Sequence, residues 1–256
     1  AYAKDRKQFG KAIIEFPAVY DMLATIKAKL DAGRALLYQT SRYVDIYKAL
    51  DDIARERKLT PEERQEQKRY AKLADSFTPL AKGMNSEYAN QNAYDCIQVH
   101  GGSGFMMEYA CQRIYRDARI TSIYEGTTQL QTVAAIRYVT NGAYAATLHE
   151  YELIPCAPEF EGYLNRIKDM TRKLEACTNA VKEAQNQELL DFVARRLYEM
   201  AAVCVMSHLL LQDATKAPEL FAQSLNVYVN YAESEVEKHF NFIRKFNAEE
   251  LASYRK

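Results

Sequence analysis

Hydrophobic side chains recur every three or four residues along most of the chain, which is the spacing of one face of an α-helix. One stripe begins at Pro17, a residue suited to the first turn of a helix. A second helix is predicted from Pro61, because Thr60 offers a capping hydroxyl and Glu63 stands three residues after that cap. The charged stretch 51–69 between these stripes is predicted to be a solvated connection. The first stripe contains Val19, Met22, Leu23, Ile26 and Leu30.

A further helix is expected around residues 77–88, and Pro79 either kinks it or marks its start. It runs into QVHGGSGF, residues 98–105, which holds three of the nine glycines. A short helical stretch is predicted over residues 109–119, followed by a helix that starts near Thr128. The apolar positions of these helices are Phe77, Leu80, Met84 and Tyr88, then Leu130, Val133 and Ala134.

The helical pattern stops around residues 147–161, where Pro155 and Pro158 indicate a linker. Three more amphipathic stripes follow, the last beginning near Pro218, and they predict a small helical bundle. The predicted fold is all-α, an up-down bundle followed by a smaller one. Its parts are a four-helix-bundle domain over residues 1–146, the linker 147–161 and a three-helix extension over residues 162–256.

The amino-acid composition and the charge balance exclude several classes of protein. Glycine and proline are scarce, at 9 and 6 of 256 residues, which favours long helices over many strands. The 34 basic residues balance 34 acidic ones, so nothing attracts nucleic acid. Five cysteines without a C-x-x-C spacing indicate reduced thiols in a cytoplasmic protein. The apolar run Met200–Leu211 is too short for a transmembrane segment and is interpreted as core, interface or membrane-surface patch.

The segment ITSIYEGTTQLQ, residues 120–131, supports two interpretations. In the first, Thr128 caps a helix together with Gln131, and the helix dipole stabilises a charged Glu125 just upstream. In the second, Glu125 lies in an apolar pocket shaped by Tyr124 and Gly126 and acts as a general base. Residue types alone favour the capping interpretation.

Two other features allow chemistry but do not require it. The glycines of residues 98–105 either end a helix, with Gly101 as a left-handed cap, or let the backbone approach a ligand closely. Cys96 and His100 are one helical turn apart and could share a metal ion. No third or fourth ligand occurs at a suitable spacing, so no metal site is predicted and both side chains are assigned to the core.

Three segments resemble the C-terminal domain of the acyl-CoA dehydrogenases. They are RKQFGKAIIEFPAVYDMLA, QVHGGSGFMMEYACQRIYRDA and ITSIYEGTTQLQ, in the family's order and over roughly the first half of the chain. The extension resembles that of long-chain members in position alone. The family's N-terminal helical domain and middle β-domain have no counterpart here, which suggests a fragment. The middle segment matches at Gln98, Gly101, Gly102, Gly104, Phe105, Glu108, Arg113 and Asp117.

The resemblance implies an oxidoreductase of fatty acid metabolism, a flavoprotein that removes hydrogen from the α and β carbons of an acyl-CoA. Its flavin adenine dinucleotide (FAD) takes the hydride, and Glu125 is placed as the base that removes the α-proton. By the same match Tyr124 and Gly126 contact the substrate, and Thr127 and Gln129 contact the cofactor.

The remaining cofactor contacts implied by the family reach the flavin of a neighbouring subunit, which implies a homodimer or homotetramer. Electron-transferring flavoprotein is the implied electron acceptor, and the fragment is expected to be inactive alone. The alternative is a non-enzymatic helical interaction module that retains the fold. The residues implied to reach the neighbour's cofactor are Arg6, Gln8, Phe9, Gln98, Gly101 and Gly102.

Overall fold

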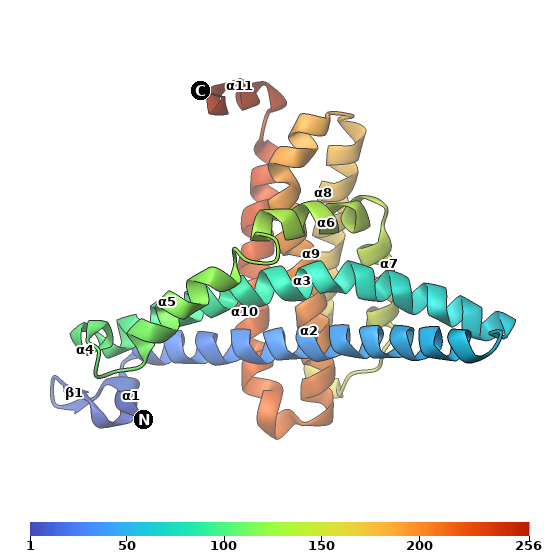
Figure 1. Ribbon diagram of the computed structural model, residues 1–256. Coiled ribbons are helices and arrows are strands. Elements are labelled where there is room, and N and C mark those ends of the chain that lie inside the picture. Colours follow the sequence, from blue (N-terminus) through green and yellow to red (C-terminus); the bar gives the residue numbers. More distant parts are fainter. Residues whose placement is uncertain (256) are drawn as a thin grey trace.

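The computed structural model describes residues 1–255. Most of these residues are helical, which confirms the all-α class (Figure 1). The elements are α1 (Tyr2–Asp5), β1 (Lys7–Gln8), β2 (Lys11–Ala12), η1 (Ile13–Glu15), α2 (Pro17–Glu56), α3 (Pro61–His100), α4 (Gly102–Phe105), α5 (Cys111–Thr121), α6 (Thr128–Thr140), α7 (Ala143–Glu152), η2 (Pro158–Phe160), α8 (Glu161–Glu183), α9 (Gln187–Lys216), α10 (Pro218–Lys245), η3 (Ala248–Glu250) and α11 (Leu251–Tyr254).

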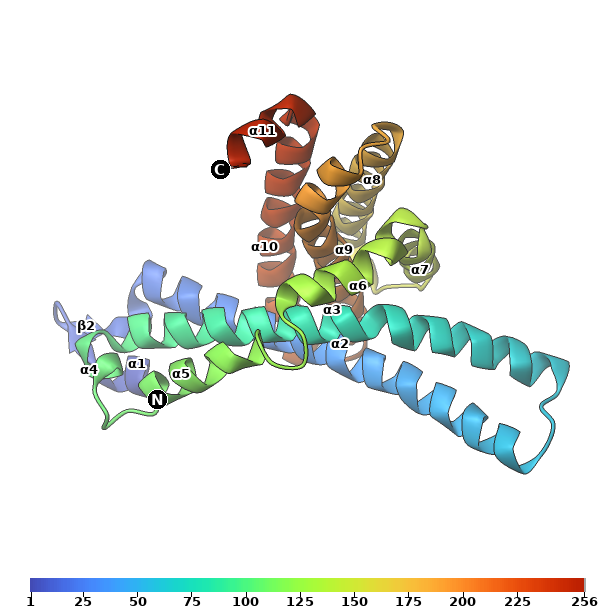
Figure 2. The same cartoon turned by 45° about the horizontal axis from the view of Figure 1, so that its top comes forward.

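Helices α2 and α3 form a long antiparallel hairpin (Figures 1 and 2). The predicted helix start at Pro17 and the predicted cap at Thr60 are both confirmed. The Thr60 hydroxyl accepts from the Glu63 N–H at 3.2 Å, and the Glu63 carboxylate accepts from the Thr60 N–H at 2.9 Å. The connection covers residues 57–60 alone. It is much shorter than the predicted 51–69, because the charged residues of that stretch occupy solvated helix ends.

Pro79 lies inside α3, so of its two predicted roles the helix start is wrong. The Tyr198 hydroxyl of α9 donates to the Pro79 carbonyl at 3.0 Å. Gly83 makes room for it, because a Cβ at Gly83 would lie 2.1 Å from that hydroxyl oxygen. A side chain of the extension therefore packs directly onto the long hairpin.

Helices α8, α9 and α10 form a bundle that crosses the α2–α3 hairpin (Figures 1 and 2). Every residue from Met200 to Leu211 in α9 is buried, so this run is core and not a surface patch. One continuous hydrophobic cluster includes residues of α2, α3, α6 and α7 together with residues of α8, α9 and α10. The two helical parts therefore share a core.

Most of the predicted linker 147–161 is helical. Helix α7 continues to Glu152, and the non-helical connection covers residues 153–157 before η2 and α8 begin. The division into a domain and an extension stays a prediction. Among residues 1–255, no helix has both the length and the apolar character needed to cross a membrane.

The buried side chain of His208 on α9 makes the stability of the fold depend on pH. Its side chain is 1% exposed, and burial, followed by Lys168 and His149, lowers its pKa to about 4 from 6.5. Between these pH values the unfolded chain binds a proton that the folded chain does not, so stability falls as pH is lowered from 6.5 through 4. The loss reaches about 3 kcal/mol. We expect His208→Leu to flatten this dependence in urea unfolding measured from pH 7 to pH 4.

The control for this experiment is His149→Gln. The carboxylates of Glu175 and Glu152 raise the pKa of His149, so its contribution has the opposite sign, being present at low pH and lost as pH rises. An acid dependence that is unchanged in His208→Leu would contradict the assignment.

Candidate functional site

The segment Ser122–Thr128 is a tight loop between α5 and α6. The Thr128 N–H donates to the Ser122 carbonyl at 3.2 Å and closes it. Thr127, not the predicted Thr128, is the N-cap of α6, and its hydroxyl accepts from the Leu130 N–H at 3.3 Å. The Thr128 hydroxyl instead donates to the Glu87 carboxylate at 2.5 Å. This interaction with α3 decides which of the two adjacent threonines caps the helix.

Glu125 occupies a left-handed backbone conformation, with φ at 50°, and Gly126 follows at 90°. Such a conformation is strained for a non-glycine residue, and strain of this kind gathers at functional sites. Two side chains hold the loop. Lys82 donates to the Gly126 carbonyl at 2.5 Å, and the Gln131 amide donates to the Glu125 carbonyl at 3.3 Å.

Tyr124 and Glu125 lie at the edge of a cleft of about 710 Å³ between α2 and α3. Both side chains are exposed, with Tyr124 at 51%. The cleft combines exposed leucines of α2 with cations, including Lys82, whose ammonium lies 5.8 Å from the centre of the Tyr124 ring. The cleft is lined by Lys29, Leu30, Gly33, Arg34, Leu37, Thr40, Ser41, Val44, Asp45, Thr78, Ala81, Lys82, Asn85, Ser86, Tyr88, Ala89, Asn92, Thr121, Tyr124 and Glu125.

A second cleft of about 510 Å³ lies where the β1–β2 hairpin meets the end of α3. The turn of this hairpin is Phe9-Gly10, and both residues have positive φ, as a two-residue hairpin turn requires. The Phe9 side chain is 94% exposed at its tip. Six residues predicted to contact a cofactor line this cleft together: Arg6, Gln8, Phe9, Gln98, Gly101 and Gly102.

The predicted residues thus fall into two groups at opposite ends of α5. Its 11 residues span roughly 16 Å at the rise of an α-helix. Thr127 and Gln129 lie near Glu125 at the start of α6 but do not line either cleft. Gly101 ends α3 with φ at 60°, as a cap does, but its ψ of −141° is not left-handed helical.

Three residues of this site were not found from the sequence. Lys82 and Gln131 hold the Glu125 loop, but a lysine and a glutamine on helices give no signal of such a role. Lys29 is 2% exposed, and its ammonium donates to Gln91 at 2.6 Å and lies 4.2 Å from the centre of the Tyr231 ring. Burial lowers the pKa of Lys29, although Asp95 and Glu235 oppose the shift.

A polar chain connects the loop to the extension. Glu87, which accepts from Thr128, lies 3.7 Å from the Arg195 guanidinium of α9. Arg195 pairs with Glu199 at 2.5 Å, and Nε2 of His239 on α10 lies 2.9 Å from the Glu199 carboxylate. Burial raises the pKa of Glu199, but the neighbouring His239 and Arg195 outweigh it and leave that pKa below its ordinary value. This network of side chains therefore keeps the half-buried Glu199 carboxylate charged.

Two family profiles together cover residues 1–251. The profile described as "Acyl-CoA dehydrogenase, C-terminal domain" matches residues 1–139, more than half of the chain. The chain belongs to the acyl-CoA dehydrogenase family. The profile "Acyl-CoA dehydrogenase C terminal" matches residues 140–251. This acyl-CoA dehydrogenase chain thus contains the family's C-terminal domain and its C-terminal extension.

Curated relatives match the first half of the chain. The "Caffeyl-CoA reductase-Etf complex subunit CarC" of Acetobacterium woodii is 36% identical over 130 residues, which are 51% of this chain and 28% of that protein. The "Probable acyl-CoA dehydrogenase FadE25" of Mycobacterium tuberculosis is 34% identical over 137 residues, 54% of this chain and 29% of its own length. The chain spans less than a third of these relatives.

Solved structures share the fold over nearly the whole chain. An acyl-CoA dehydrogenase complexed with FAD from Bacillus anthracis has a TM-score of 0.72 at 22% identity and covers 99% of this chain and 46% of its own. ACDH-11 of Caenorhabditis elegans, in complex with C11-CoA, has a TM-score of 0.66 at 19% identity, over 90% of this chain and 38% of its own. At these identities the likeness concerns the fold alone.

Removing the Lys82 ammonium should loosen the Glu125 loop. A hydrogen bond from a charged group contributes about 1.5–3 kcal/mol, so we expect Lys82→Met to speed amide exchange in residues 122–128 by at least about tenfold. Hydrogen–deuterium exchange with mass spectrometry measures this rate. Lys72→Met, an exposed position on the same helix, is the control and should leave exchange in the loop unchanged. Equal exchange in both variants would show that Lys82 does not hold the loop.

Proposed function

We propose that this chain is the part of an FAD-dependent acyl-CoA dehydrogenase that carries its catalytic base, and that Glu125 is that base. The observation that carries the proposal is the strained left-handed conformation of Glu125, held by Lys82 and Gln131 at the edge of an apolar cleft. A solvated capping residue would not need that strain. Tyr124 and Gly126, on either side, would contact the substrate.

The substrate would be an acyl-CoA thioester lying in the cleft between α2 and α3. The Glu125 carboxylate takes the α-proton, which becomes acidic as charge moves onto the thioester oxygen. That oxygen needs hydrogen-bond donors. The Glu125 N–H is available, since it has no acceptor within residues 1–255. The exposed Leu30 and Leu37 of α2 supply an apolar surface for the acyl chain.

The second cleft suits a dinucleotide. Arg6 is exposed and forms no ion pair within the described part of the chain, and a guanidinium pairs well with a pyrophosphate. Added Cβ atoms at Gly101 and Gly102 would meet nothing within 4 Å, so the backbone there is open to close approach. Bound FAD would accept the hydride from the β-carbon. Thr127 and Gln129 would contact it near the Glu125 loop.

The exposed surface favours assembly. Phe9 projects from its hairpin, and α4, α5, α6 and the loops between them expose many large apolar side chains. Apolar surface on this scale marks an interface, here with a second copy of the chain in a homodimer or homotetramer. Electron-transferring flavoprotein is the proposed electron acceptor. The exposed side chains are Phe105, Met106, Met107, Tyr109, Ile114, Tyr115, Ile120, Ile123, Tyr124, Leu130 and Val133.

The test uses the natural full-length protein, purified with its flavin. Anaerobic addition of acyl-CoA should bleach the flavin absorption, and Glu125→Gln should slow that bleaching by several orders of magnitude, because an amide cannot accept the proton. Stopped-flow absorption measures the rate. We expect the 256-residue chain alone to bind FAD weakly and to show no turnover.

Glu159→Gln serves as the matched control, because Glu159 is exposed and remote from both clefts. It should bleach at the rate of the unaltered protein. Equal rates of flavin bleaching in the Glu125 and Glu159 variants would show that Glu125 is not the catalytic base. A full-length protein that stays colourless with added FAD would favour the alternative, a helical interaction module.

A further inference from the structure

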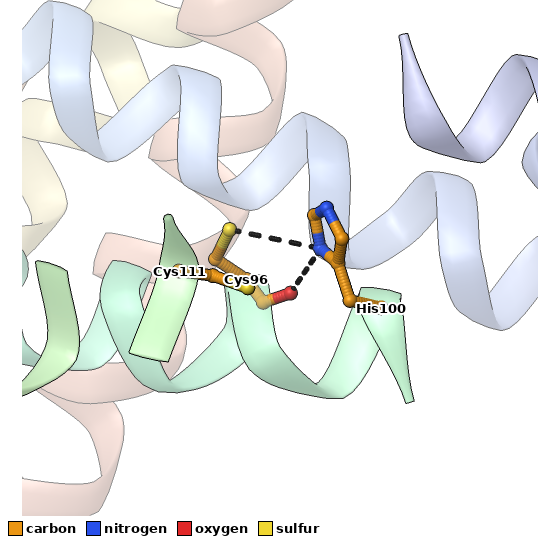
Figure 3. A group of neighbouring side chains, drawn as sticks. All are labelled: Cys96, His100 and Cys111. Carbon is orange, nitrogen blue, oxygen red and sulfur yellow. Dashed lines mark hydrogen bonds between the residues drawn. The ribbon is translucent and has the colours of Figure 1, made fainter. Parts of the chain in front are cut away.

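Three side chains that bind soft metals meet where the end of α3 packs against the start of α5 (Figure 3). Cys96 and His100 lie one turn apart on α3, and Cys111 is the first residue of α5. One sulfur or nitrogen atom from each lies within 4.8 Å of those of the other two. The sequence placed Cys96 and His100 one turn apart but predicted no metal site for lack of further ligands, and the fold brings Cys111 to them as a third donor.

Two of the three donors, the Cys96 sulfur and His100 Nδ1, are separated by nearly the distance found in a zinc site. With Zn–S near 2.3 Å and Zn–N near 2.0–2.1 Å, tetrahedral geometry places sulfur and nitrogen about 3.6 Å apart. The Cys96 sulfur and His100 Nδ1 are 3.9 Å apart. A shift of a few tenths of an ångström would let both touch one ion. A Cys₂His set leaves the fourth position to water or another donor.

The imidazole is already held in place. The Tyr2 ring stacks on it at 4.3 Å between centres, and the Tyr109 ring meets it edge-on at 5.6 Å. Without a metal, Nδ1–H can donate to the Cys96 carbonyl, 2.7 Å away. The Cys111 thiol likewise donates to the Gly104 carbonyl at 3.3 Å. A bound ion would displace the thiol protons of Cys96 and Cys111 to solvent and leave the imidazole proton on Nε2, at the cost of both hydrogen bonds to backbone carbonyls.

We propose that Cys96, His100 and Cys111 bind one Zn²⁺ ion, which ties the start of α5 to the end of α3. Cys111 is 3% exposed, so water has little access to one side of the site. A metal ion displaces the thiol protons of its cysteine ligands, so binding weakens as pH falls.

The site would stiffen the neighbouring cleft. His100 and Gly101 line the cleft that holds Arg6 and Gln98, and Gly104 is packed so tightly that an added Cβ would lie 2.7 Å from the Ile97 carbonyl oxygen. An ion across α3 and α5 would fix the glycine-rich turn between them from its other side. This metal site does not depend on the dehydrogenase activity.

Zinc titration of the 256-residue chain tests the proposal. The chain is reduced with a phosphine, freed of metal with a chelator, and titrated with Zn²⁺ against a chromogenic chelator. We expect one equivalent to bind, and Cys96→Ser and Cys111→Ser each to weaken binding by more than about a hundredfold, because even an outer-shell partner can contribute that much. Co²⁺ should give the sulfur-to-metal charge-transfer band of a thiolate site.

The controls are Cys156→Ser, half-buried like Cys96, and Cys177→Ser, buried like Cys111. Both should keep full affinity. Circular dichroism checks that each variant is folded. If Cys111→Ser does not fold, the test rests on Cys96→Ser, because Cys96 is only half-buried. Binding of less than one equivalent, or binding unchanged by Cys96→Ser, would overturn the proposal. A Cys96–Cys111 disulfide that forms in place of metal binding would also overturn it.

Discussion

The burial of α9 is the constraint on which the rest of the structure depends. Every residue of this helix from Met200 to Leu211 is buried, and α9 contacts α2, α3 and α6 as well as α8 and α10. A helix that is apolar on all faces must be covered on all faces. Neither the hairpin nor the other two helices of the extension can cover it alone, so the extension is part of the core of the family's C-terminal domain. We therefore expect the two parts to unfold together.

This shared core also explains how the extension reaches the Glu125 loop. Tyr198 on α9 fits against Gly83 of α3, and Arg195 one turn earlier faces Glu87. Glu87 in turn accepts from Thr128 at the start of α6. Through Tyr198, the buried face of α9 thus positions α3 along its axis. Through Arg195 and Glu87, its polar edge positions the start of α6. A shift of α9 would disturb the end of the loop that carries Glu125.

Local interactions could be predicted from the sequence, and contacts between distant segments could not. Thr60 and Glu63 bond to each other, so their spacing was sufficient to find the cap. Thr127 and Thr128 are equivalent in sequence, and the choice between them rests on Glu87, about 40 residues away. Cys111, the third proposed metal ligand, could not be found from the sequence for the same reason, since only the packing of α5 against α3 brings it to Cys96. The cofactor residues came from family resemblance, and the structure adds that six of them share one cleft.

The chain provides one of the two things that a carboxylate base needs, which are a fixed position and a desolvated setting. The left-handed conformation of Glu125 costs on the order of 1–3 kcal/mol. The bonds from Lys82 and Gln131 contribute about 0.5–3 kcal/mol each, enough to offset it. The position is therefore stable within this chain. The carboxylate itself is exposed, so in the proposed enzyme its desolvation must come from substrate and from protein outside residues 1–255.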